Sequence, residues 1–342
     1  MTHDIVVLGA GIAGLSCAAE LARAGRHPVV LDRAKGVGGR CATRRVEGQA
    51  VDHGVVFLHG SDPEFLAAIE NVAGGTRLDG WPGRVHGTGA PCQPDAFAGG
   101  ERRIAFVEGV SVLAKHLARG LDVRLEQRVV SLLADEDGIR LRTEDGSDHA
   151  ARTAVLALAV EQAIALLDTI QPVPAALALA ARLLRMMGTV PCLTVIAGYP
   201  AEAPDPPWDV SYPETSIVLQ LVSNDSAKRR DPRFRVMVYQ ARPHWSRQRL
   251  DQRPDEWAAE ILAEAAHQLG EWAARPLWTQ AHRWRYARTE RGSELSGPLL
   301  LSLPGGGRLG FAGEVFAPGG GVEAAWSSGR TLARQILEKE SS

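Results

Sequence analysis

The first thirty residues alternate between apolar runs and a glycine-rich stretch, in an order typical of a βαβ unit. Residues 4–8 form an apolar and β-branched run that requires burial on both faces, as in a parallel sheet. Residues 15–24 are rich in Ala and Leu and predict a helix that ends at Gly25. A second apolar run at residues 28–32 then predicts the next parallel strand.

Further strands are predicted in the middle of the chain and near its end. Apolar or alternating runs occupy residues 121–125, 129–133, 139–143 and 153–159. Residues 135–138 have the composition of a hairpin turn. Residues 309–313 predict a strand, followed by the glycines at 319–321 and a helix over residues 322–337. The end of the chain therefore returns to the pattern of its beginning.

The segment from residue 166 to residue 287 has a different composition. It holds six of the eight tryptophans and all four tyrosines. Residues 256–269 predict an amphipathic helix with Trp257, Ile261, Leu262 and Ala265 on one face. Residues 76–103 are dense in Gly and Pro, with predicted turns at 81–83 and 88–91. We therefore expect a discontinuous domain made of residues 1–75, 101–165 and 288–342, and an inserted domain made of residues 76–100 and 166–287.

Composition narrows the class of protein. A length of 342 residues suggests two domains, at about 150 residues per domain. The net charge of −2 provides no basic surface for nucleic acid or for a membrane. We expect no transmembrane span and no signal peptide, hence a cytoplasmic protein. Cys17, Cys41, Cys92 and Cys192 lack the spacing of a disulfide framework or a zinc site, and no metal site is expected.

Three glycines follow the first predicted strand and open the first helix. Gly9 permits the tight turn, Gly11 lets the backbone approach a pyrophosphate, and Gly14 lets helix and strand pack closely. The helix N-terminus attracts phosphate through its free N–H groups and its partial positive charge. Asp32, at the end of the second strand, is placed to accept hydrogen bonds from ribose hydroxyls. This pattern predicts a dinucleotide-binding domain.

Two further features favour FAD over NAD as the dinucleotide. Gly38, Gly39 and Arg40 follow the second strand, where the glycines let the backbone run beside the pyrophosphate and Arg40 adds positive charge. Near the chain end, Gly313 and the glycines at 319–321 precede a helix whose N-terminus is a second candidate ligand site.

Several stretches together resemble the flavin amine oxidase superfamily, and within it the renalase-like proteins. They are residues 9–16, 38–40, 52–57, 108–118, 244–251, 282–287 and 321–329. The resemblance implies an α/β fold with two dinucleotide-binding domains, in which a Rossmann-like FAD domain carries an inserted α+β substrate domain. It also implies an FAD-dependent oxidoreductase with FAD bound non-covalently. The superfamily's C-terminal motif has Gly-Asp where this chain has Gly313 and Glu314.

The resemblance assigns the site residue by residue. Phe57 and Trp284 are expected as walls of the substrate pocket, together with Gln240, which stands where renalase-like proteins often have His. The residues expected to bind FAD are Gly9, Gly11, Ala13, Gly14, Asp32, Arg33, Gly39, Arg40, Arg44, Gly54, Val129, Gly313, Glu314, Gly321 and Val322.

The class of substrate depends on whether a lysine side chain lies near the flavin N5. Flavin amine oxidases often use a lysine that holds a water near the flavin N5, and the candidate here is Lys228. Residues 223–231 around it are strongly polar and predict a solvated loop. A dihydronicotinamide needs no such group, because it loses hydride to become an aromatic pyridinium without losing a proton from carbon.

The sequence therefore favours an oxidase that takes hydride from 2- or 6-dihydro isomers of NAD(P)H and gives NAD(P)+. In this reading O2 reoxidises the flavin and yields hydrogen peroxide, as in renalase-like proteins. One alternative is an amine oxidase or desaturase of the same superfamily. An alternative of another class is a non-catalytic protein that binds flavin or nucleotide. The expected partners are the small-molecule substrate and O2, and the oligomeric state stays open.

Overall fold

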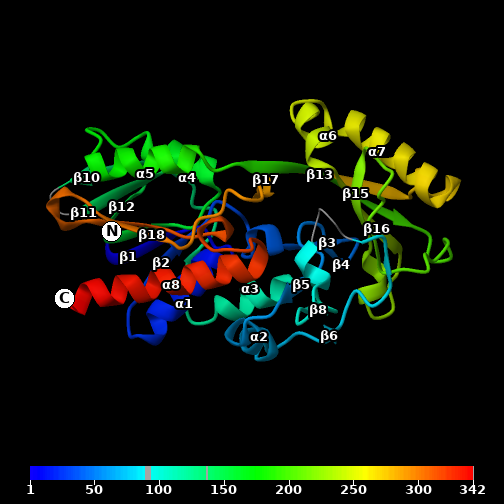
Figure 1. Cartoon of the computed structure of the whole chain (residues 1–342), viewed down its shortest axis with the longest axis horizontal. Coiled ribbons are helices and arrows are strands. Elements are labelled where there is room, and N and C mark those ends of the chain that lie inside the picture. The colour runs from blue at the N-terminus through cyan, green and yellow to red at the C-terminus, as the bar shows by residue number, and fades with distance from the viewer. Residues whose placement is uncertain (89–93, 136–137, 342) are drawn as a thin grey trace. The chain divides into compact units, whose positions relative to one another are not determined.

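The computed structural model describes residues 1–88, 94–135 and 138–341 and divides the chain into two compact units (Figure 1). The first unit comprises Met1–Gly39, Leu113–Thr189 and Arg288–Ser342, and the second comprises Arg40–Val112 and Val190–Ala287.

The first unit is built on a mixed sheet with the strand order β10-β11-β12-β1-β2-β9. At its centre β1 pairs in parallel with β12 and β2, and β9 continues the parallel set beside β2. The first half of β12 pairs with β11 and its second half pairs with β19, which in turn pairs with β18. The strands are β1 (Thr2–Leu8), β2 (Val29–Leu31), β9 (Asp122–Arg124), β10 (Val129–Asp135), β11 (Gly138–Thr143), β12 (Asp148–Leu156), β18 (Leu299–Ser302) and β19 (Arg308–Phe311).

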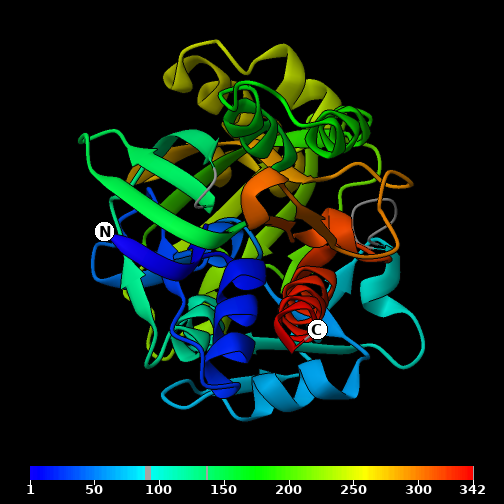
Figure 2. The same ribbon diagram turned by 90° about the vertical axis from the view of Figure 1, so that its left-hand side faces the viewer.

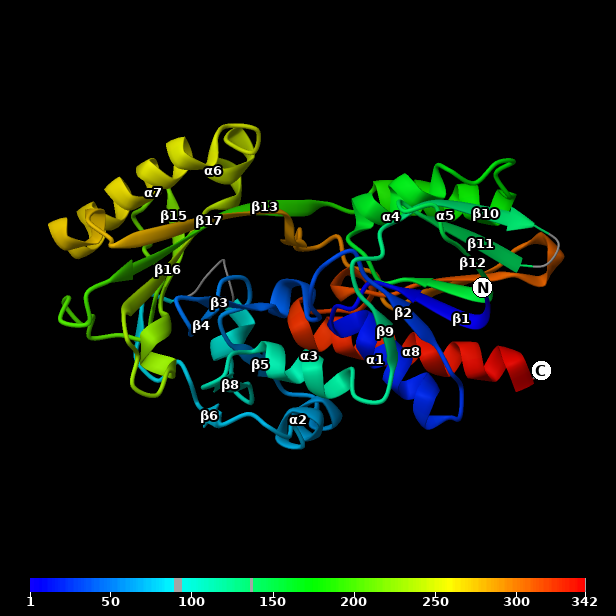
Figure 3. The same ribbon diagram turned by 180° about the vertical axis from the view of Figure 1, so that it is seen from behind.

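Helices cover both faces of this sheet, as the fully apolar strands require (Figures 1 and 3). On one side lie α4 (Val160–Leu167) and α5 (Ala175–Arg185), and on the other lie α1 (Ile12–Arg23) and α8 (Gly321–Ser341). Figure 2 shows α1 and α8 side by side. They pack closely at Ala13, since a Cβ at Gly329 would lie 2.1 Å from its carbonyl oxygen.

The second unit is built on a sheet with the order β17-β13-β16-β15-β14-β7. One face packs on α7 (Pro254–Leu269) through the buried Trp257, Ile261 and Ala265, which confirms the predicted amphipathic helix. The sheet strands are β7 (Val85–His86), β13 (Thr189–Tyr199), β14 (Val210–Ser211), β15 (Leu219–Asn224), β16 (Arg235–Ala241) and β17 (Trp278–Thr289). The other elements of the second unit are β3 (Thr43–Val46), β4 (Gln49–Asp52), β5 (Leu58–Gly60), α2 (Pro63–Glu70), β6 (Arg77–Asp79), β8 (Arg102–Phe106) and α6 (Pro243–Gln248). Helix α3 (Ser111–Leu117) contains the chain boundary between the two units, after Val112.

The division of the chain differs from the predicted one in three segments. Residues 40–75 and 101–112 pack in the second unit, whereas residues 166–189 pack in the first. Val46 and Val51 of the β3-β4 hairpin are buried against Ile196 and Val238 of the large second sheet. Similarly, α5 buries its apolar face in the core of the first unit. These contacts join residues far apart in sequence, so composition along the chain does not show them.

The predicted elements of the first unit otherwise hold closely. The helix after the glycine motif ends at Arg23, and Gly25 adopts a φ of +80°. Strands β10 and β11 pair antiparallel with Asp135 opposite Gly138, although residues 136–137 of the predicted turn lie outside the described residues. Cys92 and residues 89–91 of another predicted turn also lie outside them. Across the described residues, no helix is long and apolar enough to cross a bilayer.

Candidate functional site

The first glycine motif forms a tight turn between β1 and α1. The Gly9 amide donates to the Leu31 carbonyl at 2.8 Å, and the residue holds a φ of +105°. A Cβ at Gly14 would lie 2.0 Å from the Gly9 carbonyl oxygen, so only glycine lets helix and strand approach this closely. The first and third glycines therefore act as predicted.

Gly11 has a different reason to be glycine. Its φ of −77° and ψ of 178° suit any residue, and a Cβ there would meet no atom within 4 Å. The N-terminus of α1 carries no side-chain cap at this point. Neither packing nor backbone strain excludes a side chain, but a pyrophosphate on the helix N-terminus would. The open space at Gly11 therefore fits the pyrophosphate that the sequence analysis expects here.

The second glycine loop lies directly beside the first. The Gly38 amide donates to the Ala10 carbonyl at 2.8 Å, and Gly11 and Gly38 form an isolated β-bridge. A Cβ at Gly39 would lie 3.5 Å from the Gly11 Cα. The two loops predicted to flank a pyrophosphate are thus neighbours in space.

Asp32 closes this group of residues at the end of β2. Its Oδ2 accepts from the Ala10 amide at 2.6 Å and its Oδ1 from the Ala34 amide at 2.7 Å. A carboxylate has about four lone-pair positions, so capacity remains for ribose hydroxyls. The neighbouring Arg33 is exposed and reaches the side-chain carbonyl of Gln162 at 3.0 Å, and Val129 begins β10.

The C-terminal motif lies in the same unit. The Glu314 Oε1 accepts from the Thr289 amide at 2.6 Å and from its hydroxyl at 3.0 Å, so the longer side chain fixes the start of the last segment of this unit. The Gly313 amide donates to the Ser328 hydroxyl at 2.9 Å. Gly321 begins α8 with a φ of +77° and open space at its Cβ position, followed by the half-buried Val322.

In the second unit, Gln240 and Trp284 converge on one short piece of backbone. The Gln240 Nε2 donates to the Gly54 carbonyl at 2.6 Å, and the Trp284 indole N–H donates to the His53 carbonyl at 3.2 Å. A Cβ at Gly54 would lie 2.3 Å from the Arg40 carbonyl oxygen and 2.9 Å from the Trp284 ring. The structure thus brings together four of the predicted site residues, and Gly54 is glycine because of this crowding.

Phe57 lies in a different environment. Its side chain is 1% exposed, and its ring packs beside those of His59, Trp81 and Phe97. Protein side chains enclose this ring, whereas Trp284 is only half-buried. The structure therefore gives Phe57 the position of a core residue instead of the open wall that the resemblance implies.

Two histidines join Trp284 in a cluster that the sequence analysis did not identify. The ring centroids of His282 and Trp284 are 4.2 Å apart, and those of His53 and His282 are 4.9 Å apart. We call His53, His282 and Trp284 the imidazole–indole cluster. The signal was available, because His282 and Trp284 are two residues apart on β17 and therefore share one face of the strand.

Both histidines of the cluster are neutral near pH 7. Burial, together with the nearby His282 and Arg44, lowers the pKa of His53 to about 3. Burial and the Arg44 charge lower the pKa of His282 to about 4. The Arg44 guanidinium, expected at the flavin, lies 2.6 Å from the His282 Nδ1 and donates to it, and it also donates to Gln280 at 3.1 Å. Arg44 thereby sets the His282 tautomer with its proton on Nε2.

Acid is expected to weaken the second unit through His53. A histidine with a lowered folded-state pKa binds protons better when unfolded, so its contribution is complete above about pH 6.5 and is lost as the pH falls toward 3. Between pH 7 and pH 5 the free energy of unfolding should fall by about 2 kcal/mol from this residue alone. Urea unfolding at both pH values tests this, with His53→Gln expected to reduce the pH dependence by about this amount and to leave the contribution of His282. Replacing the exposed His244 by Gln should leave it intact, and an unchanged slope in His53→Gln would contradict the assignment.

Lys228 is buried, and the prediction of a solvated loop is wrong. Its side chain is 0% exposed, and its Nζ donates to the Asp52 Oδ2 at 2.7 Å and to the Val56 carbonyl at 2.8 Å. The Asp225 Oδ1 lies 2.8 Å from the same Nζ. The Nζ therefore donates two hydrogen bonds and forms an ion pair with a second carboxylate.

Arg229 completes a buried charge cluster with Asp52, Asp225 and Lys228. Its Nη2 lies 2.9 Å from the Asp52 Oδ2 and 2.8 Å from the Asp225 Oδ2. Burial alone would raise the pKa of Asp52, but the charges of Lys228 and Arg229 hold it below its usual value. Two carboxylates and two cations balance, so the cluster is neutral as a whole.

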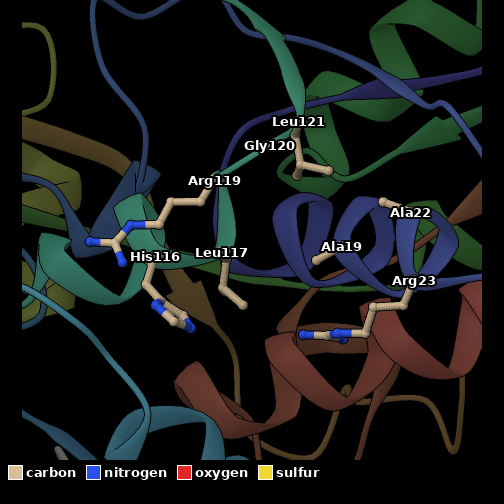
Figure 4. A pocket seen from close by; sticks show the side chains of 8 residues that line it. All are labelled: Ala19, Ala22, Arg23, His116, Leu117, Arg119, Gly120 and Leu121. Atoms are coloured by element: carbon tan, nitrogen blue, oxygen red, sulfur yellow. The ribbon is translucent and has the colours of Figure 1, made fainter.

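The first unit also has a hollow of about 270 Å³ between α1 and the end of α3 (Figure 4). Ala19, Ala22 and Arg23 line it from α1, and residues 116, 117 and 119–121 line it from the other side. It lies near the C-terminus of α1, which is about 15 Å from the glycine motif at 1.5 Å per residue. Since no residue of the glycine motif lines it, this hollow is separate from that motif.

Comparison with known proteins gives both a family and a fold. A family model for flavin containing amine oxidoreductases matches residues 92–337, and one for an NAD(P)-binding Rossmann-like domain matches residues 7–71. Pseudooxynicotine dehydrogenase from Pseudomonas sp is 38% identical over 67 residues, which are 20% of this chain and 14% of that protein. Putrescine oxidase from Kocuria rosea is 38% identical over 70 residues, 20% of this chain and 15% of that protein. These matches thus cover only a small part of the curated relatives.

Solved structures match over the whole chain. A putrescine oxidase variant superposes with a TM-score of 0.72 and 14% identity, covering 99% of both chains. Cyclohexylamine oxidase from Brevibacterium oxydans IH-35A gives 0.71 and 14%, covering 99% of this chain and all of that one (100%). At such identity the likeness establishes the flavoprotein oxidase fold alone. Because the first family model spans most of its length, this chain belongs to the flavin-containing amine oxidoreductase family, whose cofactor is FAD.

Proposed function

We propose that this flavoenzyme oxidises 2- or 6-dihydro isomers of NAD(P)H to NAD(P)+, with O2 as the electron acceptor. The overall reaction consumes one proton and one O2 for each dihydronicotinamide and gives one hydrogen peroxide. Bound FAD supplies the hydride acceptor. The observation that carries the proposal is the state of Lys228, which is fully buried, with its Nζ hydrogen-bonded to Asp52 and Val56 and ion-paired with Asp225.

Oxidation of an amine requires a step that the oxidation of a dihydropyridine does not, namely removal of a proton from the substrate nitrogen. Alkyl amines are protonated near pH 7, since their pKa lies near that of lysine, about 10. They must lose a proton before they can give up hydride. Lys228 is fully buried and already paired with two carboxylates, and Lys35, Lys115 and Lys339 are exposed residues of the first unit. A dihydropyridine gives up hydride without this step, so alignment is the main requirement.

The charges in the second unit also favour a dihydronicotinamide over an amine as the substrate. The imidazole–indole cluster is neutral near pH 7, and Arg44 is its charged neighbour. The nearby carboxylate of Asp52 is already paired with Lys228 and Arg229. An ammonium substrate would find no unpaired carboxylate among these groups. A neutral nicotinamide ring with its carboxamide suits Gln240, the indole and the imidazoles better.

Amine oxidation is the second candidate, because the family and the names of its structural neighbours favour it. Putrescine oxidase and cyclohexylamine oxidase share the fold of this chain. A direct comparison of donors therefore decides between the two functions.

The test is anaerobic reduction of the purified FAD-loaded protein by each candidate donor. The decrease in flavin absorbance measures the rate of reduction. The 2- and 6-dihydro isomers should bleach the flavin at least 100-fold faster than ordinary 4-dihydro NADH, putrescine or cyclohexylamine. Bleaching by an amine alone would replace the proposal with amine oxidation. A flavin that dithionite reduces but no donor reduces would leave a non-catalytic flavin protein.

Replacing Trp284 by Ala in the same assay locates the reaction. We expect the rate constant of flavin reduction to fall at least tenfold with the FAD content unchanged, because the variant loses the indole that bonds the His53 carbonyl. Trp278→Ala is the matched control, since Trp278 lies on the same strand but packs against Phe234. Equal rates in the two variants would remove Trp284 from the site.

A further inference from the structure

We propose that Lys228 is a positioning residue, which fixes residues 53–55 so that their backbone can hold Gln240 and Trp284 in place. The role of this segment in catalysis rests on the proposed function, whereas the clamp itself is a property of the fold. Lys228 thus acts on the site through other residues and without touching the substrate.

The ammonium group bonds both ends of the segment. Its Nζ donates to the Asp52 carboxylate on one side and to the Val56 carbonyl on the other, at 2.7 and 2.8 Å. These two residues bracket residues 53–55. A single cation therefore bridges the segment from end to end.

Each residue between the two ends makes a backbone contact that the site depends on. The His53 carbonyl accepts from Trp284 at 3.2 Å, and the Gly54 carbonyl accepts from Gln240 at 2.6 Å. The Val55 amide donates to the Arg40 carbonyl at 3.0 Å. Two consecutive peptide groups thus place two predicted pocket residues, Gln240 and Trp284, and a shift of the segment would move both.

The surroundings of Lys228 make the clamp rigid. The Nζ lies 4.8 Å from the centre of the Trp81 ring, which covers it with an apolar face. Asp225 accepts from the Asp52 amide at 3.1 Å, and the Asp52 Oδ1 accepts from Thr43 at 2.7 Å and from the Val110 amide at 3.0 Å. Hydrogen bonds in such a buried environment are stronger than in water and reinforce one another.

A compact group with three separately directed donors suits this position. Its partners are the Val56 carbonyl and two carboxylates, whereas the planar fork of Arg229 bonds the same two carboxylates and, away from Val56, the Phe106 and Val107 carbonyls. Charge balance alone would need a cation here but would not need its bond to the Val56 carbonyl. The bond to the Val56 carbonyl therefore supports a positioning role for Lys228, in addition to balancing the charge of the carboxylates.

The test uses the full-length, FAD-loaded protein and keeps the cluster neutral. In the double variant Lys228→Met with Asp225→Asn, Asp52 and Arg229 still balance. Hydrogen exchange followed by mass spectrometry should show peptides over residues 50–58 exchanging at least tenfold faster than in Asp225→Asn alone. The rate constant of flavin reduction should fall at least tenfold with the FAD content retained. Exchange in α7 should not change.

A second variant separates positioning from general destabilisation. Tyr239→Phe breaks the buried bond between the Tyr199 and Tyr239 hydroxyls (2.9 Å) on the side of the sheet that packs on α7. It should weaken the unit without changing exchange over residues 50–58. If the lysine variant changes that exchange and the reduction rate no more than Tyr239→Phe does, the positioning role is wrong.

Lys228→Gln in the Asp225→Asn background covers the case in which the methionine variant does not fold. Its amide retains two N–H donors. Its exchange rate over residues 50–58 should therefore lie between that of the Lys228→Met double variant and that of Asp225→Asn alone. Exchange equal to that of Asp225→Asn alone would overturn the clamp. Because exchange needs no substrate, failure of the clamp is distinguishable from failure of the proposed reaction.

Discussion

Replacing Gly11 by valine is expected to leave the protein folded and to abolish its retention of FAD, with an affinity at least 100-fold weaker. The φ of −77° accommodates a β-branched residue, and the new Cβ meets no protein atom within 4 Å. The side chain would instead occupy the space in front of the free N–H groups of α1, where we expect the pyrophosphate to bind. The substitution thus removes the cofactor without disturbing the core.

The measurement is flavin absorbance per protein after gel filtration, before and after incubation with excess FAD. Gly297→Val is the matched control, because Gly297 lies in the same unit and also has no atom within 4 Å of its Cβ position. It should keep the flavin. Gly14→Val should instead fail to fold, since its Cβ lies 2.0 Å from the Gly9 carbonyl oxygen. Full flavin content in Gly11→Val would exclude this motif as the cofactor site.

The first unit was largely predictable because its signals are local. An apolar run such as residues 5–8 requires burial on both faces wherever it lies, and β1 is indeed buried between β12 and β2. The roles of Gly9 and Gly14 follow from the strand before them and the helix after them. Each of these inferences uses residues within about one βαβ unit.

The buried charge cluster shows why the rest was not predictable. The stretch with Asp225, Lys228 and Arg229 has the composition of a solvated loop. Such a stretch becomes buried only when a residue far away in sequence balances its charges. That partner is Asp52, which lies 176 residues before Lys228. No local pattern shows such a pairing. The same long-range contacts place residues 40–75 in the second unit, contrary to the predicted division.

The candidate site falls between these two cases. The family resemblance selected Gln240, Gly54 and Trp284, and the structure joins them through the backbone at His53 and Gly54. Phe57 was selected by the same resemblance, yet it is enclosed by other rings. A motif identifies which residues are distinctive, whereas their exposure depends on packing partners such as Trp81 and Phe97.

Replacing Asp52 by asparagine is expected to lower the free energy of unfolding of the second unit by about 3–5 kcal/mol. Asparagine would leave Lys228 and Arg229 buried against Asp225 alone, and its amide would face their N–H groups in place of the Oδ2. Seven of the eight tryptophans lie in this unit, so intrinsic fluorescence during urea unfolding reports on it. Asp251→Asn is the control, because it removes a surface ion pair with Arg285 and should cost at most about 1 kcal/mol.

The double variant Asp52→Asn with Lys228→Met shows whether the loss comes from charge imbalance. Asp225 and Arg229 then balance, so the double variant should be more stable than Asp52→Asn alone, although a substitution has been added. Costs that simply add would mean that Asp52 and Lys228 do not interact, which would contradict the buried ion pair. Since Lys228 and Arg229 lower the pKa of Asp52, its contribution is complete above its unfolded pKa of about 3.8 and is lost only below this value. The effect of Asp52→Asn should therefore be the same at pH 7 and pH 5, unlike that of His53→Gln.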